Sequence, residues 1–159
     1  MEKIFFRSYF YVLFLFIPLF MTSCLGMGLD DLEDYNNAEI LSFKFEHRWE
    51  QMVDEIGVTR LAIVSLPTDV RIEDNVIHCV IKVPESGNPS SFTEEVRSQV
   101  KLEKIVGMAT ISTAAKIIPI DDAPILGKWG DFSKSHKYKV VAADNVTSKE
   151  WTIQCELIK

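Results

Sequence analysis

Basic charge is scarce in this sequence of 159 residues. It contains 17 Lys and Arg against 23 Asp and Glu, which gives a net charge of −6 at pH 7. An acidic surface repels the phosphate backbone of nucleic acids, and no stripe of Lys and Arg alternates with aromatic residues. The composition therefore argues against DNA or RNA as a partner.

Sequence motifs of catalysis and of metal binding are also missing. The histidines His47, His78 and His136 stand far apart and form no H-E-x-x-H or mixed His/Cys pattern. There is no G-x-S-x-G nucleophile motif and no glycine-rich loop that would hold a phosphate. The pair Asp121-Asp122 lacks the spacing of a calcium loop, so a turn is its expected role. We predict a protein that is not an enzyme and that uses neither a metal nor another cofactor.

The main apolar run, Tyr9 to Phe20, is too short to span a membrane. A span needs about 20 apolar residues, whereas about a dozen are typical of a signal peptide. The next four residues, Met21-Thr-Ser-Cys24, resemble a bacterial lipobox, whose cysteine is lipidated and becomes the new N-terminus. This resemblance implies a signal peptide over residues 1–23 and a lipid on Cys24, which would attach the protein to a membrane. The alternative is an uncleaved anchor from Ile4 to about Leu29.

Residues 24–38 combine glycine with clustered acidic residues such as Asp30 and Asp31. This composition predicts a solvated tether rather than packed structure. In lipoproteins of Bacteroidota, an acidic stretch after the lipidated cysteine is associated with display on the cell surface. The resemblance implies an outer-membrane lipoprotein at the cell surface, with the periplasmic face of that membrane and a plain linker as alternatives.

Residues 39–159 are predicted to form one domain of short β-strands. Segments 40–45 and 76–83 alternate apolar and polar residues, as half-buried strands do, with Leu41, Phe43 and Phe45 expected inward in the first. Segment 150–157 alternates in the same way, and segment 138–143 is a further predicted strand before it. The turn residues Asp144-Asn145 between the two predict a closing β-hairpin.

Other segments give weaker signals. The polar stretch 46–57 predicts a loop or a single helical turn, and Pro67-Thr-Asp predicts a tight turn. Ser91 and Glu94 resemble a capping box ahead of a short helix from Phe92 to about Val100. Further strands are expected at 61–66, 102–112 and 115–120. The pattern predicts an all-β, immunoglobulin-like β-sandwich of about seven strands.

Several blocks of this domain resemble Ig-like domains of Bacteroidota surface lipoproteins. They are Ile40-Leu-Ser-Phe-Lys-Phe, the strand 71–84 that ends in Val-Pro, the block 102–119, and Asp131-Phe-Ser with the hairpin after it. These motifs are structural and contain no catalytic group. The resemblance implies a domain of the cell surface that often accompanies glycan-binding or glycan-degrading modules.

Cys79 and Cys155 both fall on the predicted inward faces of their strands. An exported chain can form a disulfide, and a bond across the two sheets would stabilise the fold by about 4–5 kcal/mol in the chain-entropy model. Two free thiols packed in the core are the alternative, because a free cysteine behaves as a small apolar residue.

Trp129 is the main candidate for ligand binding. It stands between two glycines in a long connection, where an aromatic face can stack on a sugar while Lys128 and Asp131 offer hydrogen bonds. The alternative is that Trp129 folds over the end of the sandwich beside Phe132. We expect a binding module for a glycan or for another surface protein, and the alternative function is a structural spacer or fimbrial-type assembly subunit.

Overall fold

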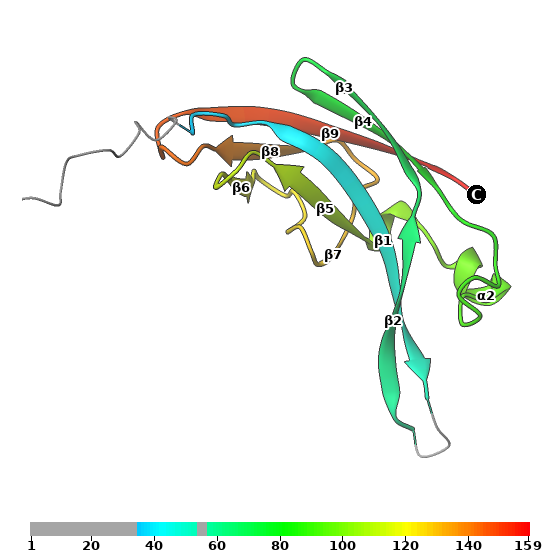
Figure 1. Ribbon diagram of the computed structural model, residues 1–159. Coiled ribbons are helices and arrows are strands. Elements are labelled where there is room, and N and C mark those ends of the chain that lie inside the picture. The colour runs from blue at the N-terminus through cyan, green and yellow to red at the C-terminus, as the bar shows by residue number, and fades with distance from the viewer. Residues whose placement is uncertain (1–34, 54–56) are drawn as a thin grey trace, which may run out of the picture. The chain divides into compact units, whose positions relative to one another are not determined.

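The computed structural model describes residues 35–53 and 57–159, which form two packed β-sheets (Figure 1). Sheet A has the strand order β2-β1-β5-β7, and sheet B has the order β3-β4-β9-β8-β6. The predicted all-β sandwich is confirmed, with nine strands in the described residues in place of about seven. No helix among these residues is long and apolar enough to cross a membrane. The predicted signal peptide, Cys24 and the tether up to residue 34 lie outside the described part.

The bounds of the elements follow the chain order. Sheet A consists of β1 (Ile40–Met52), β2 (Thr59–Leu66), β5 (Ile105–Ile111) and β7 (Trp129–Gly130). Sheet B consists of β3 (Thr68–Glu73), β4 (Val76–Lys82), β6 (Lys116–Pro119), β8 (His136–Val141) and β9 (Ser148–Ile158). A short helix α2 (Glu94–Ser98) and a 3-10 turn η2 (Leu102–Lys104) lie between β4 and β5.

The start of β1 differs from the predicted alternation. Its register with β5 shifts between Ile40 and Ser42, and an irregularity of this kind changes which side chains face the core. Ile40 and Phe43 are buried, whereas Leu41 is 60% exposed. The prediction that Leu41 points inward is therefore wrong.

Two further segments form strands where the sequence predicted loops or turns. β1 continues to Met52 through the stretch expected to be a loop, and the predicted turn at 67–69 overlaps β3, which pairs with β4. The outer halves of β1 and β2 form a hairpin that extends beyond the other strands (Figure 1). His47 is buried within β1, which shows that the inward alternation of Phe43 and Phe45 continues past the predicted end of the strand.

β9 lies inside sheet B, antiparallel to β8 and parallel to β4. The predicted hairpin between β8 and β9 is confirmed. In its turn the carboxylate of Asp144 accepts hydrogen bonds from the backbone N–H groups of Val146 and Thr147 at 2.8 and 2.9 Å. Asn145 adopts φ +58°, a left-handed conformation that asparagine tolerates better than most residues.

The core between the sheets is rich in aromatic side chains. Phe45 and Phe132 meet edge to face with ring centroids 5.1 Å apart, and Tyr138 is fully buried. The Tyr138 hydroxyl donates a 2.7 Å hydrogen bond to the carbonyl of Pro124 and so fixes the long connection before β7. The indole N–H of Trp151 in β9 donates a 3.0 Å bond to the carbonyl of Ala38, just before β1. This bond links the start of sheet A to sheet B.

Candidate functional site

A groove of about 720 Å³ opens beside β1, next to the first residues of the neighbouring strand β5. β5 pairs with β1 only from Ile40 to Glu46, so residues 47–50 have no neighbouring strand on that side. The groove is lined by His47–Glu50, by residues of the segment 96–104, and by Trp129. We call it the β1 groove.

His47 and Trp49 form an aromatic stack along the groove. Their rings lie 5.8 Å apart at an interplanar angle of 15°, and Trp49 also packs against the buried Phe92 at 5.7 Å. His47 is only 3% exposed, and neither ring nitrogen has a hydrogen-bond partner of ordinary geometry. Burial is the main cause that lowers the pKa of His47, the ammonium of Lys104 lowers it further, and the carbonyl of Lys104 opposes both. The neutral imidazole therefore predominates at pH 7.

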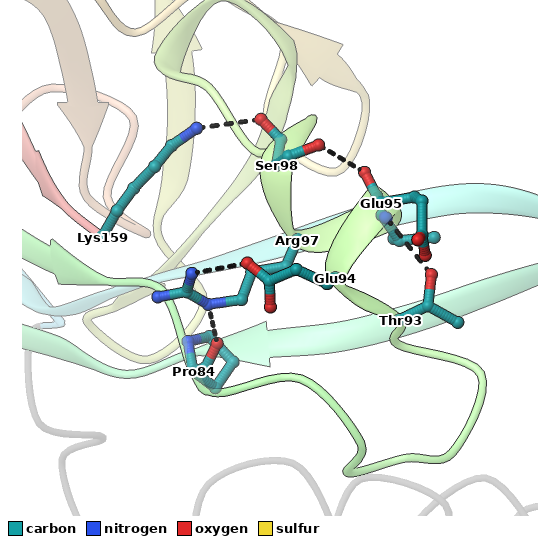
Figure 2. Close-up of polar contacts among 8 residues, drawn as sticks. Pro84, Thr93, Glu94, Glu95, Arg97, Ser98 and Lys159 are labelled. Atoms are coloured by element: carbon teal, nitrogen blue, oxygen red, sulfur yellow. Dashed lines mark hydrogen bonds and ion pairs between the residues drawn. The ribbon is translucent and has the colours of Figure 1, made fainter.

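The helix α2 forms a second wall of the groove, and a set of polar contacts holds it in place (Figure 2). Arg97 donates hydrogen bonds to the carbonyl of Pro84 at 3.0 Å and to the carboxylate of Glu94 at 3.1 Å. Lys159, beyond the end of β9, donates a 2.9 Å bond to the carbonyl of Ser98. These contacts fix α2 against the ends of β4 and β9.

The predicted capping box of this helix is wrong, although the helix itself is present. Its N-cap is Thr93, whose hydroxyl accepts from the N–H of Val96, and the helix spans Glu94–Ser98 rather than residues 92–100. The flanking residues Phe92 and Val100 are fully buried. Their side chains attach both ends of the helical segment to the core. The apolar residues of this segment therefore predicted its burial correctly.

Trp129 lies at the rim of the groove and is 48% exposed. It pairs with Val106 of β5, while Lys104 places its ammonium 5.7 Å from the centre of the indole ring.

The preceding Gly127 adopts φ +83°, and its N–H donates to the carbonyl of Gly107 at 2.9 Å. Arg48 donates to the carbonyl of Gly127 at 3.1 Å. The loop that presents Trp129 is thus fixed to both β5 and β1.

A second hollow of about 440 Å³ also borders Trp129 and is lined by Arg48, Leu61 and Lys128 among others. The structure therefore brings Trp129 and Lys128 together, as the sequence predicted. Asp131 is not part of either lining. Its carboxylate accepts a 2.8 Å hydrogen bond from the N–H of Ser133, and contacts with Ser133 lower the pKa of Asp131. This carboxylate stabilises a turn.

Phe132 is buried in the core, whereas Trp129 is half exposed. Trp129 is therefore not packed into the core, and its role in binding, rather than in covering the end of the sandwich beside Phe132, stays a prediction. The other half of the site was not predicted from the sequence; it consists of His47, Trp49, Lys101 and Lys104. A strand signal was available for the first two, because they continue the alternation of Phe43 and Phe45.

Cys79 and Cys155 are free thiols in the structure, which is the alternative that the sequence left open. They lie at paired positions of the parallel strands β4 and β9, so the expectation of a pair across the two sheets is wrong. A hydrogen bond with Cys79 and burial both raise the pKa of the Cys155 thiol.

No group of three or more His, Cys, Asp or Glu residues among residues 35–53 and 57–159 is arranged to hold a metal ion. His136 donates a 2.7 Å hydrogen bond from Nε2 to the carbonyl of Asp131, and its Nδ1 lies 3.8 Å from the exposed carboxylate of Asp122. Asp121 adopts φ +53° in a turn, the role that the sequence predicted for this acidic pair.

With its two-sheet sandwich and an open groove at the edge of sheet A, the chain has the fold of a small β-domain. Residues 40–154 match the DUF5018-related family, and the chain belongs to this family. A solved protein of Bacteroides fragilis NCTC 9343, described as secreted, is similar to it at 33% identity and a TM-score of 0.71. That match covers 79% of this chain and 99% of the other.

A solved protein of Bacteroides thetaiotaomicron VPI-5482, described as a glycoside hydrolase, matches at 18% identity and a TM-score of 0.46. The match covers 83% of this chain and 28% of that protein. No curated protein matches the chain.

Proposed function

We propose that this chain is a lipid-anchored, non-enzymatic module of the outer membrane that binds a glycan in the β1 groove at the cell surface. The observation that supports the proposal most directly is Trp129, a half-exposed indole at the rim of a groove that also contains Trp49. Indole faces stack on the C–H faces of sugar rings, and the polar groups of Gln99 and Ser98 on the opposite wall suit sugar hydroxyls.

The location outside the cytoplasm agrees with the description of the B. fragilis relative as secreted. The finer placement at the outer membrane rests on the lipobox-like sequence that ends in Cys24 and on the acidic residues that follow it. The resemblance to Ig-like domains of Bacteroidota surface lipoproteins supports the same placement.

The small number of acidic groups in the described lining of the groove favours binding without catalysis. Among the described residues, Glu50 is the one carboxylate in its lining, whereas glycoside hydrolysis in most families uses a pair of carboxylates on either side of the scissile bond. An assembly subunit that waits for a donated strand is disfavoured, because β9 of this chain already fills the position between β4 and β8.

Trp129→Ala tests the proposal by affinity electrophoresis in gels that contain polysaccharides, with a glycan array to find the binders. We expect the variant to lose between about fivefold and about 140-fold in affinity, if the stacking of a sugar ring on an indole is worth as much as the about 1–3 kcal/mol of a nucleobase on an aromatic ring. Its melting temperature should stay close to that of the unchanged protein, since Trp129 is half exposed.

Ile125→Ala is the matched control, because Ile125 is 56% exposed in the same connection and lines neither hollow. The proposal fails if the unchanged protein binds no glycan on the array. It also fails if both variants retain full affinity.

A further inference from the structure

The β1 groove differs in charge from the rest of this acidic protein. Arg48, Lys101 and Lys104 line it, against the single carboxylate of Glu50 among the described lining residues. Arg48 is already neutralised by Glu46, at 3.0 Å. Lys101 and Lys104 are exposed and have no carboxylate within ion-pair distance in the described part of the chain. Two uncompensated ammonium groups therefore face the groove.

Backbone hydrogen bonds of the turn η2 fix the position of Lys104. The N–H of Lys104 donates to the carbonyl of Lys101 at 3.0 Å within η2, and the N–H of Phe132 donates to the carbonyl of Leu102 at 2.8 Å. This turn is thereby fixed to the buried Phe132 and to the strand that presents Trp129. Lys104 places its ammonium over the Trp129 ring, 5.7 Å from the ring centre. A sugar that stacks on this face displaces the ammonium to the side, where it can pair with an acidic substituent of the sugar.

His47 provides a second and independent feature of the same groove. It is 3% exposed, and neither ring nitrogen has a hydrogen-bond partner of ordinary geometry, although the carbonyl of Lys104 is close enough to raise its pKa. A buried polar group without a well-formed hydrogen bond costs free energy, and a small rotation of the His47 ring toward the groove would let a bound hydroxyl or carboxylate supply a partner. An anion placed beside Lys104 would also offset the positive charge that disfavours protonation of this imidazole.

From these contacts we infer that the β1 groove binds an acidic saccharide, whose sugar ring stacks on Trp129 and whose carboxylate or sulfate lies between Lys101 and Lys104. The inference rests on the proposed glycan binding and specifies its ligand class. A neutral glycan would leave both ammonium groups without a counterion. An acidic peptide has the charge but lacks the flat C–H face that an exposed indole accommodates.

The test uses the full chain and isothermal titration calorimetry with three probes: tetragalacturonate, a sulfated galactotetraose without uronate, and neutral galactotetraose. The double variant Lys101→Gln/Lys104→Gln should lose about tenfold or more in affinity for an acidic probe, because two charge-assisted contacts are removed. The matched control Lys134→Gln/Lys137→Gln changes two exposed lysines outside the groove and should lose less than about twofold. Affinity of the unchanged protein for acidic probes should fall as salt rises.

The three probes separate the outcomes. Preference for tetragalacturonate identifies a uronate and preference for the sulfated galactotetraose identifies a sulfate, and either result supports the inference. The inference is overturned if neutral galactotetraose binds as tightly as the acidic probes and the lysine variant binds as well as the unchanged protein. In that case the proposed function still holds if Trp129→Ala abolishes the binding of galactotetraose. Absence of binding to every saccharide overturns both, as does binding to an acidic peptide alone. Free galacturonate or sulfate that binds as tightly as the tetrasaccharide overturns the saccharide part.

Discussion

A Cβ atom added to Gly107 would lie 2.6 Å from Cζ of Phe132 and 3.0 Å from Cε1 of Phe43. Gly107 faces the core from β5, opposite Phe45 of β1. Because Gly107 has no side chain, the rings of Phe43, Phe45 and Phe132 can pack together at this position. The glycine is required by packing, not by an unusual backbone conformation, because its φ lies outside the left-handed region.

Gly107→Ala should lower the free energy of unfolding by about 1–3 kcal/mol, since the added methyl group has to displace buried rings. Urea unfolding followed by tryptophan fluorescence measures the change. Thr110→Ala, an exposed position on the same strand, is the control and should stay within about 0.5 kcal/mol. An unchanged midpoint for Gly107→Ala would contradict the packing described here.

The two strand cysteines should react slowly in the folded protein. Cys79 is buried, and its hydrogen bond with Cys155 raises the pKa of the latter, so little thiolate is present at pH 7. In a Cys24→Ala chain, a chromogenic disulfide reagent should label almost nothing in native buffer. It should label both thiols in denaturant without reductant. If denaturant exposes no thiol until a reductant is added, the two cysteines form a disulfide.

The stability of the domain should fall as the pH falls below about 6.5, partly through His47. Burial lowers the pKa of His47 from its ordinary value of 6.5, so the unfolded chain binds a proton that the folded chain does not. Stability is therefore complete above pH 6.5 and decreases below it, by at most about 1.4 kcal/mol per pH unit from this group. His47→Phe keeps an aromatic ring stacked on Trp49 and removes the titratable imidazole.

The measurement is the difference in unfolding free energy between His47→Phe and the unchanged protein at pH 8 and at pH 5. The difference should shift in favour of the variant at the lower pH. A difference that is the same at both values would show that the imidazole does not resist protonation in the folded state.

Cys24→Ala should release the protein from the membrane fraction, because the predicted lipid has no attachment point without this thiol. Phase separation in a nonionic detergent, followed by immunoblotting, measures the partition. Ser23→Ala is a matched control, since it retains a small residue before the cysteine and should remain in the detergent phase. If Cys24→Ala stays in the membrane pellet, the alternative of an uncleaved N-terminal anchor is correct.

Strands with clean alternation were predicted well from the sequence. In β4, buried Ile77, Cys79 and Ile81 alternate with more exposed residues, and Trp151 and Ile153 do the same in β9. β3 was missed because it is a short edge strand with polar residues, held by its pairing to β4 rather than by burial. Leu41 was misplaced because a register shift depends on the partner strand, which the local sequence does not reveal.

The candidate site was predicted only in part, for a reason of topology. Trp129 and Lys128 are neighbours in sequence, so one loop signal found both. Trp49 and Lys104 reach the same groove from β1 and from the turn before β5, and their proximity follows from strand pairing. Asp131 shows the opposite case, because a residue adjacent to the site in sequence forms a turn away from it.

The interior position of β9 has a consequence for the order in which the domain can assemble. β3 and β4 can pair early, and so can β6 and β8, but each pair ends in an open edge until β9 arrives between them. Contacts between segments far apart in sequence are slow to form, and β9 follows every other strand along the chain. A nascent chain that has not yet delivered residues 148–158 therefore lacks a complete sheet B. Sheet B, and with it the sandwich, closes only after β9 has been synthesised.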